Sequence, residues 1–298
     1  MKLLTYRKGD GYGLGALVGE HLLDVNKALN VRLDMLKLLD QGEKTLGKVA
    51  DAVKAAEGKA KAGKTDGLLR LKDLRLAAPI PRTRKNIVCL GLNYAEHVKE
   101  GGRDRDLPPH PVFFTKPPTS ITGPYDPVVY SKAVEKLDYE VEMAFVIGKT
   151  GKYIDRDDVY DHIAGYMTFQ DISARTLQRQ HQQWFRGKSL DTFAPMGPYL
   201  VTSDEVGDPQ SLDLWCKVNG KIRQQSNTRN MIFDVRTIVS TISDGITLEA
   251  GDVFATGTPS GVGAAHPLGL LNVGDVIESS VEKLGTLKNE VIAEKYPR

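Results

Sequence analysis

The chain has 298 residues, of which 41% are hydrophobic, and a formal net charge of +2. This length and composition predict one large soluble domain, or a large and a small one, with a sizeable core. Acidic and basic residues nearly balance and no basic tract alternates with aromatics, which argues against nucleic acid or an anionic membrane as a partner.

The cysteines and the first residues of the chain indicate in which cellular compartment the protein is expected. Cys89 and Cys216 lie in apolar, strand-like segments, where a small buried hydrophobic residue is the expected role. Residues 1–13 carry charges where a signal peptide needs an apolar run, and no stretch is long and apolar enough to span a bilayer. We therefore expect a reduced, cytoplasmic protein with no membrane partner.

Residues 1–78 are predicted to form a small α/β N-terminal domain. It is expected to contain a hairpin, an edge segment and two helices, over residues 2–7 with 14–18, near 21–25, and over 31–39 and 44–56. Pro79-Ile80-Pro81 marks its end, because proline cannot donate to a strand ladder and restricts the residue before it. Residues 79–298 are then expected to form the main domain.

The first candidate chemistry lies just after a predicted strand over residues 85–90. His97 and Glu100 stand three apart on a helical segment, so the carboxylate can orient the imidazole and raise its basicity. This pair would make a general base, although a polar surface helix is the common alternative. Residues 101–109 are charged and poor in apolar side chains, which predicts a mobile lid near residues 93–109.

The most informative segment is a predicted strand over residues 137–148. Glu140 and Glu142 are two apart and share one face of it, which continues into the apolar Ala144 and Val146. The opposite face carries Val141, Met143 and Phe145. Two buried like charges repel unless a cation lies between them. We therefore expect positive charge there; the alternative is a solvated strand face.

A third carboxylate ends the next predicted strand, over residues 165–171. Asp171 precedes Ser173, which is expected to cap a helix over residues 174–183. Three carboxylates without cysteine or an obligatory histidine make an oxygen-only site suited to Mg²⁺ or Mn²⁺. An unrelated aspartate at a helix start remains the alternative.

Several bases and amides follow these acids. Arg175 and Gln178 are three apart on the predicted helix, on a common face with Asp171 near its start. Lys188 is placed on a glycine turn, and Lys116 ends a strand that prolines stop. Arg175 could instead neutralise the acids or lie on the surface, and Lys188 could be solvated.

The C-terminal third is predicted to be rich in strands. Asn219-Gly220 is a strong hairpin signal, and a helix is expected over residues 231–243 with Asn227 and Asn230 as candidate caps. The glycine-rich turn over residues 257–263 offers backbone amides and the Thr258 hydroxyl to an anion. It lacks the spacing and the lysine of a phosphate-binding loop.

In this order the motifs resemble those of the fumarylacetoacetate hydrolase family, from about Ile80 to the C-terminus. Six signatures carry the resemblance: Gly91-Leu92-Asn93-Tyr94 with His97 and Glu100, Phe114-Thr115-Lys116-Pro117, Asp138-Tyr139-Glu140-Val141-Glu142, Asp171-Ile172-Ser173-Ala174-Arg175, Gly187-Lys188-Ser189, and Thr256-Gly257-Thr258-Pro259-Ser260-Gly261-Val262-Gly263.

The resemblance implies an α+β, mainly β fold, built as a mixed β-sandwich roll, and a homodimer. It also implies the roles of particular residues: Glu140, Glu142 and Asp171 as ligands of Mg²⁺ or Mn²⁺, His97, Glu100 and Lys188 as catalytic residues, and Arg175, Gln178, Thr258 and Lys116 as substrate-binding residues. The leading domain is not covered by the resemblance.

From the resemblance we expect a metal-dependent enzyme that cleaves a C–C bond of a small 2-oxo acid, as an acylpyruvate-type hydrolase or an oxaloacetate decarboxylase. The alternatives are an isomerase or decarboxylase of 2-hydroxyhepta-2,4-diene-1,7-dioate and a diketo sugar acid hydrolase. A non-catalytic metabolite-binding protein is a remote alternative.

Overall fold

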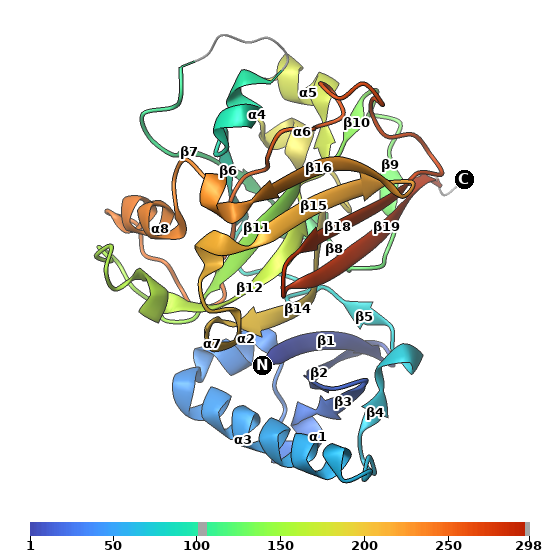
Figure 1. Cartoon of the computed structure of the whole chain (residues 1–298), viewed down its shortest axis with the longest axis vertical. Helices are drawn as coiled ribbons and strands as arrows, with labels where there is room; N and C mark the ends of the chain where they lie inside the picture. The colour runs from blue at the N-terminus through green and yellow to red at the C-terminus, as the bar shows by residue number, and fades with distance from the viewer. Residues whose placement is uncertain (101–105, 296–298) are drawn as a thin grey trace.

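The computed structural model describes residues 1–100 and 106–295 of the chain. The leading part forms antiparallel strands with helices on one side (Figure 1). Its elements are β1 (Lys2–Lys8), β2 (Gly11–Val18), β3 (His21–Asp24), α1 (Val25–Leu29), α2 (Met35–Asp40), α3 (Gly42–Lys61), β4 (Leu69–Arg70), η1 (Leu71–Asp73) and β5 (Leu76–Ala77). The predicted hairpin is confirmed as β1 and β2. Helix α3 runs beyond the expected residue 56, because the Ala- and Lys-rich segment contains no proline and still favours helix.

The first half of the remaining chain supplies the residues that carry the predicted chemistry. Its elements are β6 (Ile87–Gly91), α4 (Ala95–Lys99), β7 (Val112–Lys116), η2 (Pro118–Ser120), β8 (Ile121–Thr122), β9 (Val128–Tyr130), β10 (Leu137–Asp138), β11 (Val141–Ile147), η3 (Val159–His162), β12 (Ile163–Gln170), β13 (Ser173–Ala174), α5 (Arg175–Gln180) and α6 (Phe185–Lys188).

The second half is dominated by strands, as expected. Its elements are β14 (Ala194–Thr202), α7 (Ser203–Val206), η4 (Pro209–Ser211), β15 (Asp213–Val218), β16 (Lys221–Asn227), η5 (Thr228–Asn230), α8 (Val235–Ser243), β17 (Val253–Ala255), β18 (Val276–Val281) and β19 (Gly285–Ala293). The hairpin predicted at Asn219-Gly220 is confirmed by the antiparallel pairing of β15 with β16.

Two sheets pack face to face. The larger has twelve strands, in the order β4-β3-β2-β1-β14-β12-β11-β17-β6-β7, with β5 on β1 and β8 on β14. The smaller has the order β16-β15-β18-β19-β9 and lies over β11, β12 and β14 (Figure 1). Most neighbours are antiparallel, but β17 and β6 run parallel. This is the sheet-dominated, mixed α+β fold that we expected.

The leading strands continue the larger sheet. Strand β1 pairs with β14, with Lys2 opposite Val201, so the sheet crosses the predicted boundary near residue 78. Val49 of α3 also belongs to the same apolar cluster as Ala144 of β11. The division into two domains therefore stays a prediction, and the two parts share one sheet and one core.

Strand β11 lies at the centre of the core and is buried on both faces. Val141, Met143 and Phe145 belong to one apolar cluster, whereas Ala144 and Val146 belong to the other. This confirms the predicted alternation. Glu142 therefore points into a face of β11 that is covered by protein, where an isolated charge would be costly.

Some local predictions are wrong because long-range contacts override local preference. Ser173 caps no helix, because it pairs with Asp138 across β10 and β13. The strand expected over residues 137–148 is also not continuous: it is interrupted at residues 139–140, between β10 and β11. Helix α8 begins later, at Val235 with Asp234 as its cap, because Ile232 and Phe233 are tied to Asn93.

A further correction concerns Lys188, which ends the short helix α6 instead of lying on a glycine turn. The predicted lid is described in part: α4 is present, while residues 101–105 lie outside the described residues. No helix among the described residues is long and apolar enough to cross a membrane.

Candidate active site

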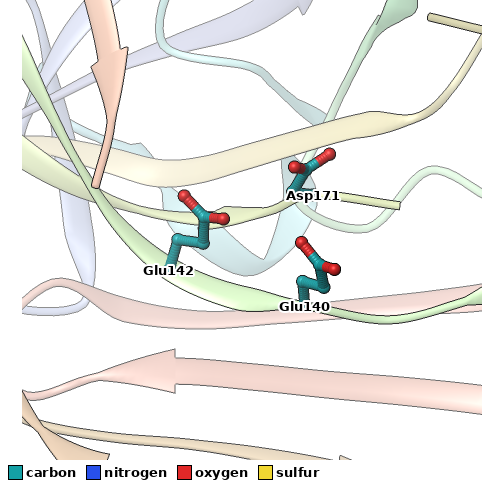
Figure 2. Close-up of side chains that lie close together, drawn as sticks. All are labelled: Glu140, Glu142 and Asp171. Atoms are coloured by element: carbon teal, nitrogen blue, oxygen red, sulfur yellow. The ribbon is translucent and has the colours of Figure 1, made fainter. Parts of the chain in front are cut away.

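Three carboxylates meet where the chain enters β11. Glu140 and Glu142 come from that segment, and Asp171 follows the neighbouring strand β12. The backbone N–H of Asp171 donates to the Glu140 carbonyl at 2.8 Å, which joins the two segments. One carboxylate oxygen from each residue lies within 4.8 Å of the others, and all three side chains are buried. Figure 2 shows the three carboxylates grouped together.

Three buried cations surround these carboxylates. The Lys188 ammonium donates to Glu140 Oε2 at 2.7 Å and to Asp171 Oδ2 at 2.6 Å. Lys116 binds Asp171 Oδ1 and donates to the carbonyl of Ile172 at 3.1 Å. Arg175 Nη2 lies 2.7 Å from Glu140 Oε1. The positive charge expected near the acidic pair is thus supplied partly by the protein.

These neighbours set the protonation of the cluster. Burial opposes ionisation of Glu140, but the charges of Lys188 and Arg175 outweigh it and lower the pKa of Glu140. Burial lowers the pKa of Lys116. Burial also opposes the charge of Lys188, yet Asp171 and Glu140 raise its pKa. Lys188 therefore stays a cation at neutral pH.

Of the three carboxylates, Glu142 is the one that forms no ion pair with a lysine or arginine of the described residues. Burial, together with the charges of Asp171 and Glu140, raises the pKa of Glu142 well above its usual value. Its Oε2 accepts a hydrogen bond from the Gly257 amide at 2.8 Å, but its buried Oε1 has no partner among the described residues. A buried, unpaired oxygen beside two further carboxylates fits a hard divalent cation.

The predicted histidine–glutamate pair is formed on α4. His97 Nδ1 lies 2.9 Å from Glu100 Oε2, and Glu100 Oε1 accepts from the Gly261 amide at 2.6 Å. A second link joins α4 to the same turn, from the Ser260 hydroxyl to Glu96 at 3.2 Å. Both oxygens of Glu100 are thus engaged, and the imidazole is held with Nδ1 toward the carboxylate.

The glycine-rich turn after β17 serves the protein's own carboxylates. The amides of Gly257, Gly261 and Gly263 donate to Glu142, Glu100 and Asp138 respectively. These amides therefore do not offer the free anion site that the sequence suggested. The Thr258 hydroxyl donates to the Val141 carbonyl at 2.8 Å and accepts from Gln224 at 2.8 Å.

A pocket of about 560 Å³ opens beside the carboxylates. Seven predicted site residues line it: His97, Glu100, Glu140, Arg175, Gln178, Lys188 and Thr258. Glu142, Asp171 and Lys116 do not line it and are almost completely buried. The structure thus gathers all ten predicted residues around one place, with the last three lying deeper than the pocket wall.

Sequence reasoning missed two parts of this site. Asp138 is fully buried and accepts hydrogen bonds from Arg175 Nε at 2.8 Å and from the amides of Gly263 at 2.6 Å and Ala264 at 3.0 Å. It therefore joins the glycine-rich turn to Arg175. Its place in the Asp-Tyr-Glu-Val-Glu segment was the available signal.

The second missed part is an aromatic wall of the pocket. Phe114 and Trp184 meet edge to face, with ring centroids 5.4 Å apart, and the Lys188 ammonium lies 5.2 Å from the Phe114 centroid. A Cβ atom at Gly91 would come within 2.0 Å of the Trp184 ring, so only glycine leaves room for it. No spacing in the sequence connects these residues.

Comparisons with known proteins show what the chain is similar to. Residues 86–292 match the model of the family described as Fumarylacetoacetate (FAA) hydrolase C-terminal. The chain is 41% identical over 283 residues to oxaloacetate tautomerase YisK of Bacillus subtilis (strain 168), covering 91% of this chain and 93% of that protein.

Two solved structures share the fold along nearly the whole chain. A fumarylacetoacetate hydrolase from Exiguobacterium antarcticum has a TM-score of 0.82 at 38% identity, covering 99% of this chain and 100% of that one. Maleylpyruvate hydrolase from Sphingobium sp. SYK-6, in complex with manganese (II) ion and pyruvate, has a TM-score of 0.79 at 30% identity, with the same coverage. The chain is therefore an enzyme of the fumarylacetoacetate hydrolase family.

Proposed function

We propose that this enzyme acts on a small 2-oxo acid and moves a proton between its carbon and oxygen atoms, as in the keto–enol tautomerisation of oxaloacetate. The observation that carries the proposal is the hydrogen-bonded His97–Glu100 pair, which lines the same pocket as Glu140 and Lys188. Support also comes from the similarity to a protein named oxaloacetate tautomerase.

Glu140, Glu142 and Asp171 would hold a divalent cation, Mg²⁺ or Mn²⁺. The unpaired Glu142 Oε1 and the oxygen-only donor set support this assignment, as does the manganese bound in the related hydrolase. When bound, such a cation supplies a Lewis acid that polarises the 2-oxo group. Lys116, which is buried behind the residues that line the pocket, would hold Asp171 in place.

The side chains that line the pocket would carry the proton transfer. His97 Nε2 takes a proton from C3 of the substrate, while Glu100 holds the ring through Nδ1. The C–H electron pair forms the C2–C3 double bond, and the C2–O π pair moves to the oxygen. That oxygen takes up a proton from water to give the enol, and His97 releases its proton to water. The Lys188 ammonium stabilises negative charge on that oxygen. Arg175, Gln178 and Thr258 would bind and orient the substrate.

C–C bond cleavage is the second candidate, and it is the reaction that the sequence analysis favoured. The same base can deprotonate a water that attacks a distal carbonyl, which yields an acylpyruvate hydrolase. Similarity to a maleylpyruvate hydrolase favours this candidate. An oxaloacetate decarboxylase would need less from His97, because CO₂ leaves once the developing enolate is stabilised.

The deciding experiment follows both reactions in one sample. Purified protein with Mn²⁺ is given oxaloacetate or acetylpyruvate, and NMR records the keto, enol and pyruvate signals, with an EDTA control. Faster keto–enol exchange without pyruvate supports the tautomerase; pyruvate formation supports cleavage. Full activity in EDTA, or in the Glu142→Gln variant, would contradict the metal assignment, whereas no change in either substrate would refute both reactions.

Three further expectations stay predictions. They are the homodimer, the cytoplasmic location and the separate folding of residues 1–78. Size-exclusion chromatography with light scattering would test the first of them.

A further inference from the structure

We propose that Arg179 recognises a second carboxylate on the substrate, so that the pocket selects 2-oxo dicarboxylic acids over 2-oxo monocarboxylic acids. This inference rests on the proposed function, because it assumes that the 2-oxo end of the substrate lies at the carboxylate cluster. The ion pairs of the cluster and the order of side chains along α5 support it.

The buried charges leave no cation for a second carboxylate. Four buried acids, Asp138, Glu140, Glu142 and Asp171, face three buried bases, Lys116, Arg175 and Lys188. Each of these three bases lies against an acid of the same cluster. A second carboxylate on the substrate therefore needs another positive group.

The buried bases are already occupied by the protein. Arg175 lies against Asp138 and Glu140, and Lys188 binds Glu140 and Asp171. Arg179 also lines the pocket but is exposed, and it makes no hydrogen bond or ion pair with residues 1–100 or 106–295. Within the described part of the chain, it is thus the arginine of the pocket wall that no carboxylate engages.

Helix α5 orders the lining side chains from the buried cluster outward. Arg175 and Arg179 are four residues apart, so they share a helix face and lie about 6 Å apart along the axis. Exposure increases along this face, from the buried Arg175 through the half-buried Gln178 to Arg179. This order suits a short diacid, with its 2-oxo end near Arg175 and its second carboxylate at the rim beside Arg179 and Gln182.

Pyruvate and oxaloacetate test this directly, because they differ by one carboxylate. Calorimetry measures binding of each to the Mn²⁺-loaded protein, in the wild type and in Arg179→Gln, with steady-state kinetics alongside. We expect Arg179→Gln to weaken oxaloacetate binding about tenfold, which corresponds to about 1.4 kcal/mol, and to leave pyruvate binding within about twofold. Arg179→Lys should recover part of the loss.

Arg186→Gln is the matched control, because Arg186 is an exposed arginine nearby on α6 that does not line the pocket. It should change neither affinity. Equal effects of Arg179→Gln on both ligands, or no effect on oxaloacetate, would overturn the proposal. If the wild type does not turn over oxaloacetate, the proposed reaction fails. The affinities for oxaloacetate and pyruvate still decide the role of Arg179.

Discussion

Replacing Asp138 gives a sharp test of how the candidate site is held together. Its carboxylate is fully buried and accepts four hydrogen bonds, from the Arg175 side chain and from the amides of Tyr139, Gly263 and Ala264. Asp138→Ala would leave part of a buried guanidinium and two turn amides without their acceptor. Breaking a buried ion pair by removing one partner costs about 3–5 kcal/mol.

We therefore expect Asp138→Ala to lower the free energy of unfolding by about 3–5 kcal/mol. Asp138→Asn keeps the volume and one acceptor oxygen but loses the charge, and should cost about 2 kcal/mol. Urea denaturation followed by circular dichroism measures both. Asp157→Asn is the control, since that side chain is 96% exposed and its ion pair with Arg236 should contribute less than about 0.5 kcal/mol.

The same variants test whether Asp138 fastens the glycine-rich turn. Hydrogen exchange should show faster exchange of the Gly263 and Ala264 amides in Asp138→Asn, because their acceptor loses its charge. An unfolding free energy for Asp138→Ala within 1 kcal/mol of the wild type would refute the energetic reasoning, with about 1 kcal/mol being the cost of one ordinary hydrogen bond. Unchanged exchange would refute the anchoring role.

Three further predictions concern separate parts of the chain. His97→Ala should lower kcat by roughly 10²- to 10⁴-fold in steady-state assays, the usual contribution of a general base; an unchanged kcat would remove His97 from that role. Hydrogen bonds from Lys8, the Lys27 amide and Tyr6 outweigh burial and lower the pKa of Asp24, so Asp24→Asn should cost about 1 kcal/mol near pH 7. That difference should fade as pH falls through the native pKa, and a pH-independent difference in thermal unfolding would contradict it. Asp234→Ala should cost about 1–2 kcal/mol in urea unfolding, because Asp234 caps α8, while Asp234→Asn should retain much of the cap.

The features predicted correctly from sequence depend on the short-range periodicity of the backbone. A spacing of two brought the carboxylates of Glu140 and Glu142 together at the start of β11, and a spacing of three brought His97 against Glu100. The Asn219-Gly220 turn likewise fixed the β15–β16 hairpin. In each case the geometry follows from residues only a few positions apart.

Contacts between distant segments could not be predicted in this way. Ser173 has a good capping side chain, yet it lies in β13 because Asp138, 35 positions away, pairs with it. Similarly, the start of α8 depends on Asn93. Local propensities differ by about 1 kcal/mol or less per residue, so strand pairing and burial outweigh them.

The sequence by itself determined which residues are candidates for the chemistry: the three acids, the histidine–glutamate pair, and the bases that follow them. Only the tertiary structure decided their partners. Lys188 bridges Glu140 and Asp171, Lys116 lies behind Asp171, and β1 extends the sheet through β14. The physical reason is that side-chain periodicity is set within a few residues, whereas the neighbour of a buried charge depends on which distant strands the whole chain brings together.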